Sequence, residues 1–371
     1  MCFRIREDLG REALEPLWRD LESRAEARFF LSWDWIGAWL AELGTAPPVL
    51  TGEAEGRIVL LAIPVPFHRV EAGLIRVHGL RLHSTGRRDE DAIAIEYNGF
   101  LTDRAWEGRA ERAAIVFLLG PARIGGRRRD EVHILAASAD RQVALVPPGM
   151  LLQVPGRKPS WRVDLAAVRA AGGDYLGTLR PNTRQQIRRA MRLYAARGAL
   201  TATRAASAAE ARDYLDTMAE LHQAQWTARG EPGGFSFPFF VRFQRRLAES
   251  GVPAGRVELL RVAAGERPIG YLMNLIDGGH VMAFVSGFVF EDDPRLKPGL
   301  VCHALAIARH AAEGAACYDF LAGAYRYKEN LGRPGPEFAY LLIQRPTPMT
   351  RFEHALRRLR AALRHQPQPG P

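Results

Sequence analysis

The stretch RVELLRVAAGERPIGYLMNLIDGGHVMAFVSGFVF, residues 256–290, decides the fold of the second half of the chain. Three apolar runs, Arg256–Ala263, Pro268–Ile276 and His280–Phe290, are separated by the polar turns Gly-Glu-Arg and Asp-Gly-Gly. Short turns that contain glycine join neighbouring antiparallel strands. The stretch therefore predicts an antiparallel meander of three strands.

Helices and strands flank this meander on both sides. Their predicted ranges are helices at 180–197, 207–229, 239–249 and 299–313, and strands at 199–204, 316–321 and 338–344. Ser207 and Glu210 have the capping-box spacing at the start of the second helix, and Thr183 and Gln186 have it in the first. The order predicts an α+β fold in which a mostly antiparallel sheet is flanked by helices.

The first half is predicted to be a second unit of the same class. Its predicted helices are 12–22, 33–43 (introduced by Ser32 as N-cap) and 104–118, and its strands are 49–52, 57–66, 74–82, 92–101, 132–137 and 143–147. Prolines and glycines between 147 and 159 predict a linker. We therefore expect domains at 1–155 and 156–348, followed by a basic amphipathic helix and disordered tail at 349–371.

The positive charge of the chain is concentrated in two segments. The chain has 51 Lys+Arg against 41 Asp+Glu, a net charge of +10, and its 47% hydrophobic residues are typical of globular proteins. Segment 180–197 carries six arginines and no acid, and segment 351–371 carries five arginines and one acid, so the remaining chain is neutral. The first segment predicts either an anionic partner or a solvated face lying against acids of the other domain. The second predicts peripheral membrane contact or docking on its own domain.

Composition also argues against several classes of protein. The N-terminus is charged, and the most apolar stretch, Ile58–Phe67, is too short to cross a bilayer, so a cytoplasmic location is predicted. Three widely spaced cysteines predict neither a disulfide framework nor a zinc site, and no metal is expected.

Three motifs together resemble one known family. LRPNTRQQIRR (179–189), LHQAQW (221–226) and YDFLAG (318–323) with Tyr327-Lys328 are similar to the CelD/BcsL (BioF2-like) acetyltransferases. These enzymes form a branch of the GNAT (Gcn5-related N-acetyltransferase) superfamily and are related to the FemAB peptidyltransferases. The resemblance covers about residues 155–345 and is weak over the first half. It implies two tandem GNAT-like domains, the first degenerate, and acetyl-CoA or another acyl-CoA as cofactor.

The resemblance also implies where the acyl donor binds. In GNAT enzymes the fourth strand and the next helix hold the pantetheine and pyrophosphate, because free N–H groups at a helix N-terminus attract anions. The candidate cofactor-binding residues are Arg295, Lys297, Gly299, Leu300 and, on the fourth strand, Ser286. Leu296 and Val301 depart from the family pattern Q/R-x-x-G-x-G/A. An ordinary helix start remains the alternative for this loop.

Acyl transfer to an amine needs a base, stabilisation of the oxyanion and an acid for the leaving thiolate. We predict Asp319 as base or amine anchor, Tyr327 as the acid, and His222 as a further catalytic candidate. The alternatives are a carboxylate that fixes the Tyr327-Lys328 turn, a solvated loop, and a core histidine on the apolar stripe of its helix.

Residues for the acceptor are predicted from both halves of the chain. Polar residues in Glu96-Tyr97-Asn98-Gly99 close an apolar strand, where their side chains would reach a cleft between the domains. The predicted substrate-binding residues are Arg184, Trp226, Lys328, Glu96 and Asn98. Lys328 would hold a phosphate or carboxylate.

Three functions follow from these observations. The first is a CoA-dependent N-acyltransferase that acylates an amine of a small molecule or of a sugar or envelope precursor. The second is a FemAB-like transferase that uses aminoacyl-tRNA and binds RNA through the arginines of 180–197. The third is a catalytically inactive GNAT scaffold that binds an acidic partner or a membrane through its basic helices.

Overall fold

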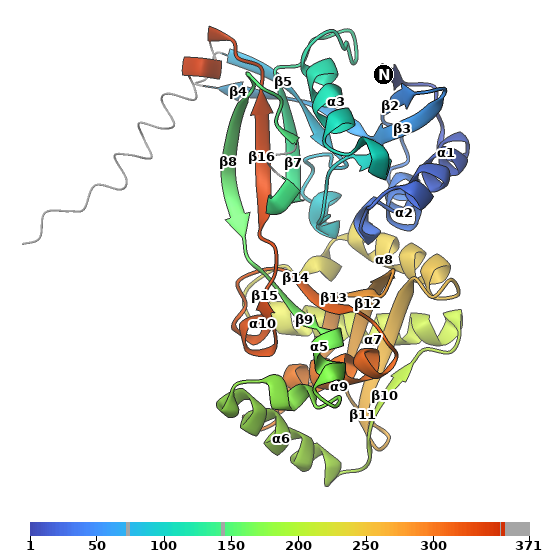
Figure 1. The fold of residues 1–371 in the computed structure, drawn as a ribbon. Coiled ribbons are helices and arrows are strands. Elements are labelled where there is room, and N and C mark those ends of the chain that lie inside the picture. The colour runs from blue at the N-terminus through green and yellow to red at the C-terminus, as the bar shows by residue number, and fades with distance from the viewer. Residues whose placement is uncertain (72–74, 142–144, 349, 353–371) are drawn as a thin grey trace, which may run out of the picture.

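The computed structural model describes residues 1–71, 75–141, 145–348 and 350–352. Two halves are stacked along the long axis of the molecule (Figure 1), and the chain begins in the upper half. The helix and tail predicted at 349–371 fall almost wholly outside the described residues, and so does most of the strand predicted at 143–147, of which the described part is not a strand.

The lower half contains a seven-stranded mixed sheet in the order β10-β11-β12-β13-β14-β9-β15. Its strands are β9 (Ser160–Asp164), β10 (Leu200–Arg204), β11 (Val257–Ala264), β12 (Arg267–Asp277), β13 (His280–Phe288), β14 (Cys317–Ala322) and β15 (Arg333–Pro334). Its helices are α5 (Leu165–Ala170), α6 (Pro181–Ala195), α7 (Ala208–Thr227), α8 (Pro238–Gly251), α9 (Pro298–Ala312) and α10 (Arg326–Leu331). The predicted meander, β11 to β13, and the α+β class are confirmed.

Helices cover both faces of this lower sheet. Along β12, Tyr271 and Met273 pack into the core with α7 and α8, whereas Ile269 and Leu272 pack into the core with α9. Side chains that follow one another on a strand point to opposite faces, so a strand covered on both sides reads as a continuous apolar run. This explains why the quoted stretch is apolar without alternation.

The upper half contains two sheets, in the orders β1-β2-β3-β6 and β4-β5-β7-β16-β8. The strands are β1 (Cys2–Arg6), β2 (Val49–Ala54), β3 (Arg57–Ala62), β4 (Pro64–Glu71), β5 (Ile75–Leu82), β6 (Leu101–Thr102), β7 (Glu131–Ser138), β8 (Leu151–Lys158) and β16 (Phe338–Gln344). The helices are α1 (Arg11–Arg24), α2 (Trp33–Leu43) and α3 (Arg109–Leu119). Ser32 accepts a hydrogen bond from the Trp35 N–H and caps α2 as predicted.

The last strand lies in a different sheet from the one expected. The prediction that 338–344 completes the C-terminal sheet is wrong, because β16 pairs with β7 and β8 of the upper half (Figure 1). Buried Gln344 explains the placement, because its amide donates to Glu131 on β7 and accepts from Gln153 on β8. The linker predicted near residue 155 is strand β8, which leads directly into β9. Pro155 is tolerated there because β8 is an edge strand.

Two other local predictions are also corrected. The strand expected at 92–101 is a short 3-10 helix, Asp91–Ile93, and a loop, with only β6 at its end. Ala94 and Tyr97 have positive φ values of 53° and 48°, which a strand does not allow. Helix α6 begins at Pro181, so Thr183 lies inside the helix and does not cap it.

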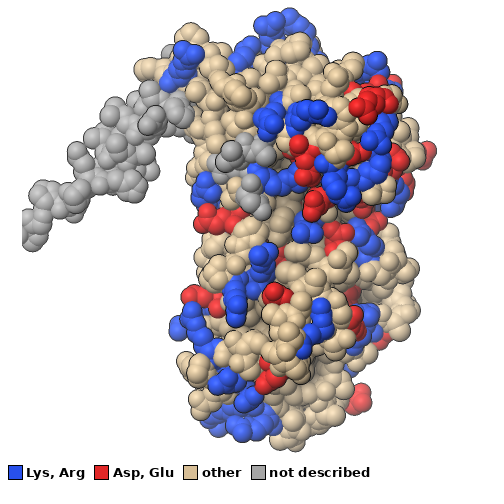
Figure 2. All heavy atoms as spheres, in the orientation of Figure 1, with Lys and Arg blue, Asp and Glu red and all other residues tan. Residues whose placement is uncertain are grey.

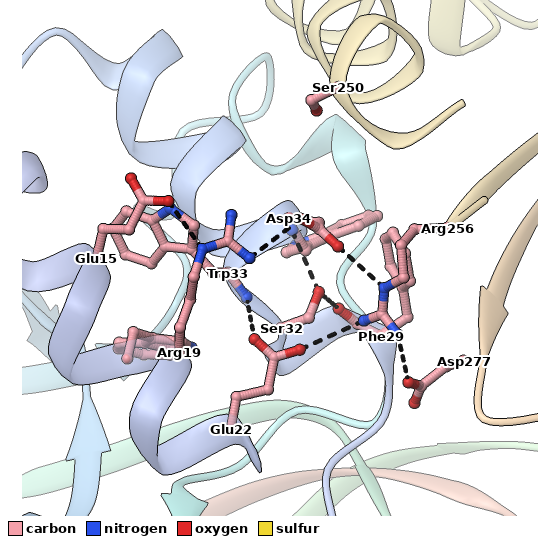
Figure 3. Close-up of polar contacts among 12 residues, drawn as sticks. Glu15, Arg19, Glu22, Phe29, Ser32, Trp33, Asp34, Ser250, Arg256 and Asp277 are labelled. Atoms are coloured by element: carbon pink, nitrogen blue, oxygen red, sulfur yellow. Dashed lines mark hydrogen bonds and ion pairs between the residues drawn. The ribbon is translucent and has the colours of Figure 1, made fainter. Parts of the chain in front are cut away.

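The two halves are joined by an apolar seam and by ion pairs, among them those of Arg242 and Arg246 with Glu42 and those of Arg256. Trp35 of α2 packs edge-on against Phe243 of α8, with ring centroids 4.8 Å apart. Immediately before β11, Arg256 Nε and Nη1 donate to Asp34 at 3.0 Å and Asp277 at 2.9 Å (Figure 3). Its Nη2 donates to Glu22 at 3.3 Å. These contacts fix the lower sheet to α1 and α2.

Candidate active site at the junction of the halves

Strands β13 and β14 diverge next to the seam. They pair in parallel only between His280–Met282 and Cys317–Asp319. Along β13 the register with β12 shifts, and Phe284 is the extra, unpaired residue of a bulge. A bulge bends a strand and turns its side chains aside. The last paired position, Asp319, therefore stands where the two strands separate.

Asp319 is buried, with 1% of its surface exposed, and both of its carboxylate oxygens have partners within the protein. Its Oδ2 accepts from the Tyr97 hydroxyl at 2.5 Å and contacts His280 Nε2 at 3.0 Å. Its Oδ1 accepts from the Leu321 N–H at 2.8 Å. Tyr97 belongs to the upper half, so Asp319 ties the two halves together at this point.

Glu96 and Lys328 lie beside this carboxylate. Glu96 Oε2 accepts from the Ala322 N–H at 2.9 Å, and Lys328 Nζ donates to the Ala322 carbonyl at 2.7 Å. Burial raises the pKa of Glu96 to about 7, and burial lowers the pKa of Lys328 to about 8 although Glu96 and Asp319 oppose that shift. A carboxylate and an ammonium thus both titrate near neutral pH.

The backbone at the junction is held in uncommon conformations. Tyr97 and Leu321 have positive φ values of 48° and 61°, and neither is a glycine. Such residues cost free energy and persist where the surroundings hold them. They lie on opposite sides of the seam, adjacent to Glu96 and Ala322, whose hydrogen bond crosses it.

The predicted catalytic and acceptor residues are only partly brought together. Glu96, Asp319 and Lys328 meet at the junction. Asn98 instead is buried in the upper half, where it contacts His83 Nδ1 and donates to the Leu82 carbonyl. Tyr327 stacks on buried His303, with ring centroids 5.7 Å apart.

His222 and Trp226 mark a separate region at the seam. His222 Nδ1 lies 3.0 Å from the Ser286 carbonyl oxygen, which is hydrogen-bonding distance. Burial lowers the pKa of His222. Trp226, Glu231 and Phe237 line a hollow of about 440 Å³ whose other side is formed by Arg88, Asp91 and Ala92 of the upper half. The hollow brings aromatic, acidic and basic groups to one place.

The predicted donor loop precedes α9. Pro298 has no N–H, and the Val301 N–H donates to the Lys297 carbonyl. The N–H groups of Gly299 and Leu300 are therefore the ones at the start of the helix that have no partner within it. Arg295 binds the carboxylate of Asp293 through Nε and Nη2, the latter at 2.6 Å. Its charge is therefore already paired.

The departures from the family pattern are packed into the core. Leu296 is 5% exposed, and Val301, in the first turn of α9, is fully buried. Both belong to the core between α9 and the sheet. A Cβ added to Gly299 would lie 3.1 Å from the Phe288 ring. The loop is thus fixed by apolar packing on β13.

Helix α6 carries the first basic segment. Figure 2 shows Lys and Arg side chains gathered at the lower end of the molecule, over α6. Arg188, Arg189 and Arg192 are exposed, while Arg184 is half-buried and donates to the Gly177 carbonyl. Arg188 faces Asp174 at 3.5 Å, a solvent-exposed pair of little energetic value.

Sequence reasoning did not assign Tyr97 or His280. Tyr97 stood inside the quoted Glu96–Gly99 motif, which was the available signal. His280 follows a Gly-Gly turn on a strand and carries no motif. Among the described residues, no group of three His, Cys, Asp or Glu side chains is arranged to hold a metal, and no helix is long and apolar enough to cross a membrane.

Comparison with known proteins identifies the class of the lower half. Residues 181–329, from α6 into α10, match the family described as acetyltransferase (GNAT) domain. No curated protein sequence matches the chain. The match covers less than half of the chain, and it places a GNAT-type acetyltransferase domain in residues 181–329, as the resemblance predicted.

Solved structures resemble the chain over nearly its whole length. The crystal structure of FemX is 12% identical, with a TM-score of 0.59, and the match covers 95% of this chain and 99% of FemX. The C-terminal domain (DUF2156) of a putative lysylphosphatidylglycerol synthetase from Agrobacterium fabrum is 9% identical, with a TM-score of 0.53 and coverages of 95% and 97%. L-PGS from Bacillus licheniformis is 12% identical, with a TM-score of 0.50 and coverages of 93% and 94%. At these identities the likeness shows a shared fold over both halves of the chain.

Proposed function

We propose that this protein is an acyltransferase that joins an activated acyl group to an amine at the junction of its two halves. The observation that carries the proposal is the meeting of Glu96, Asp319 and Lys328 where β13 and β14 diverge. The GNAT domain supports acyl transfer as the reaction class. Acyl-CoA is the proposed donor, bound at the start of α9.

Glu96 is the proposed base. Its Oε1 makes no hydrogen bond with the described residues, whereas both oxygens of Asp319 are occupied. A base works best when its pKa lies near the working pH, and the pKa of Glu96 is raised to about 7. Asp319, first predicted as base or amine anchor, is then a positioning residue that holds Tyr97.

The proposed reaction uses three groups of the chain. The amine nitrogen attacks the thioester carbonyl while Glu96 takes the ammonium proton, and the oxyanion forms near the Lys328 ammonium. Lys328 uses two of its three donor positions on the described residues, on the Leu321 and Ala322 carbonyls. The C–S bond then breaks, and the thiolate takes a proton from the hydroxyl of Tyr327, which is 38% exposed and stacks on His303.

The hollow at Trp226 is the proposed site for the part of the acceptor that does not react, while the reacting amine lies at Glu96. Aromatic faces attract cations, and carboxylates bind ammonium groups or sugar hydroxyls. Trp226 already faces the Arg229 guanidinium at 5.6 Å from its ring centroid, and Asp91 and Glu231 add carboxylates to the wall. An aminated small molecule or sugar fits these groups.

Calorimetric titration with acetyl-CoA tests the proposed donor. Lys297→Glu reverses the charge beside the free N–H groups of α9 and should weaken binding at least tenfold. Arg295→Gln should change affinity less than threefold, because Asp293 already holds that guanidinium. Arg267→Gln, an exposed arginine on β12, is the control. Absence of acetyl-CoA binding at millimolar concentration would overturn the proposed donor.

The exposed arginines of α6 favour one second candidate, a FemAB-like transferase that uses aminoacyl-tRNA. Arg188→Glu with Arg192→Glu should then abolish tRNA binding, and the affinity of the unmodified protein should fall steeply with salt. Binding of tRNA together with failure to bind acetyl-CoA would favour this candidate. Binding of acetyl-CoA without tRNA would reject it.

A further inference from the structure

A second hollow lies in the upper half, against β4 and β5, and shares no lining residue with the junction. It measures about 320 Å³ and is lined by Pro66, Phe67, His68, Arg76, His78, Arg127 and Arg129. His68 and His78 face each other across the β4–β5 pair, with ring centroids 6.4 Å apart. Neither the acyl-transfer proposal nor the GNAT domain match, which begins at 181, includes these residues.

The charged groups lining this hollow are all of one sign. Three are arginines, two are histidines, and no Asp or Glu of the described chain lines it. Arg76 and Arg127 form no ion pair with any carboxylate that the structure describes. Three fixed positive charges around one concavity create a potential that attracts anions.

Arg129 is the buried member of the set. Only 4% of its surface is exposed, its Nη2 donates to the Ile124 carbonyl, and its Nε has no hydrogen-bond partner in the described chain. A buried cation without a counterion is costly, and a bound anion would offset that cost. Burial and neighbouring Arg127 lower its pKa, and the charge of Asp130 opposes that shift without reversing it.

The nearest acid does not neutralise the hollow. Asp130 accepts from the Arg345 guanidinium at 3.0 Å and from the His78 N–H at 3.2 Å, so both of its oxygens are engaged. Asp130 is therefore shared with Arg345, and it still acts on Arg129 and His78 as a single negative charge. The arginines of the hollow keep their net positive charge.

A tight turn holds two of these arginines in place. Gly125 and Gly126 have φ values of 57° and 72°, and Ile124 and Arg127 form an isolated bridge across the turn. Two successive positive φ values are the geometry of a type I′ turn. Arg127 thus leaves a fixed turn and Arg129 folds back beneath it, which is the preorganisation that a ligand site needs.

We propose that this hollow binds a phosphoryl group, such as a pyrophosphate or the terminal phosphates of a phosphorylated metabolite. The guanidinium fork matches phosphate oxygens in pairs, and three arginines match the charge of pyrophosphate. The ring of Phe67 is already covered by the Arg81 guanidinium at 3.9 Å and by His133, so the site recognises the anion and not an aromatic base.

Calorimetric titration of the full chain with inorganic pyrophosphate tests this proposal. The double variant Arg76→Gln, Arg127→Gln should raise Kd at least tenfold, and Arg129→Met should do so if it folds. Arg123→Gln, an exposed arginine outside the hollow, should change Kd less than twofold. Sulfate at the same concentration controls for nonspecific charge and should bind at least tenfold more weakly.

Two results would overturn the proposal. One is the absence of measurable binding heat at 5 mM pyrophosphate, a concentration roughly ten times the Kd of a weakly bound metabolite. The other is equal affinity of the double variant and the unmodified chain. Arg76 and Arg127 are both exposed, so the circular dichroism spectrum of the double variant should match that of the unmodified chain. A matching spectrum separates loss of binding from loss of fold.

Discussion

At the scale of single residues, the hydroxyl of Tyr97 is the direct link between the upper half and the buried carboxylate of Asp319. Tyr97→Phe removes a 2.5 Å hydrogen bond to a charged acceptor and should lower the free energy of unfolding by about 1–3 kcal/mol. Urea denaturation measures this change. Tyr325 is exposed, so Tyr325→Phe should change the free energy of unfolding by less than about 0.5 kcal/mol. Equal effects of the two substitutions would contradict the role of Tyr97.

The sequence also marked several of these residues before their environment was known. Asp319 and Lys328 stood in motifs of the resemblance, and Glu96 stood at the end of an apolar run. Their grouping could not be predicted, because it depends on loops with positive φ at Tyr97 and Leu321 and on contacts between residues more than 220 positions apart.

At the scale of elements, the residue immediately before β11 carries the cation that holds α1 and α2. Arg256→Ala leaves Glu22, Asp34 and Asp277 together without their shared partner, and should destabilise the protein by about 2–4 kcal/mol. The pKa of Glu22, already raised by burial, should rise further, because Arg256 holds it down.

Thermal unfolding of Arg256→Ala and of a matched control measures this contribution. Arg212→Ala breaks only an exposed pair with Glu249 and should cost under about 0.5 kcal/mol. A similarly small effect of Arg256→Ala would mean that the apolar seam and the other polar contacts across it, such as those of Glu42 with Arg242 and Arg246, join the halves without Arg256.

Elements themselves were predicted where local signals are strong. Ser32 and Ser207 cap α2 and α7 as expected, and the range of β16 was predicted to the residue. Its sheet was not, because which sheet a strand enters depends on partners such as Glu131 and Gln344, far apart in the sequence. Strand β8 was read as a linker because Pro155 and Gly156 are common in loops.

At the scale of the whole molecule, each half contains a buried carboxylate held in its charged form. Burial opposes the charge of Glu131, but hydrogen bonds from Arg69 and His133 outweigh it and lower its pKa to about 2. In the lower half, burial likewise opposes the charge of Glu258, while His310, Asn274 and Arg204 lower its pKa to about 2.

Both groups predict how stability depends on pH. A carboxyl whose pKa is lower in the folded state stabilises the fold above its unfolded value, near 4.5, and loses that contribution as pH falls toward 2. Urea denaturation should therefore show stability falling between about pH 5 and pH 2. Glu131→Gln should be less stable at pH 7 but fall less steeply, and an unchanged slope would contradict this account.

The arrangement of the whole chain supports a reaction centre built from both halves. Strands β8–β9 and β15–β16 carry the chain across the seam, and Glu96 reaches the Ala322 N–H from the other side. This geometry places the Glu96 carboxylate where it can act as base, and a rate measurement tests that role directly.

The most direct test is the rate at which free CoA thiol appears from acetyl-CoA with a panel of primary amines, measured from pH 5.5 to 9. The unmodified protein should gain rate as pH rises through about 7, where Glu96 loses its proton, and lose rate above about 8, where Lys328 does. Glu96→Gln should be slower by about 10²-fold or more and lack the lower limb. An equally active Glu96→Gln with the same pH profile would contradict the account.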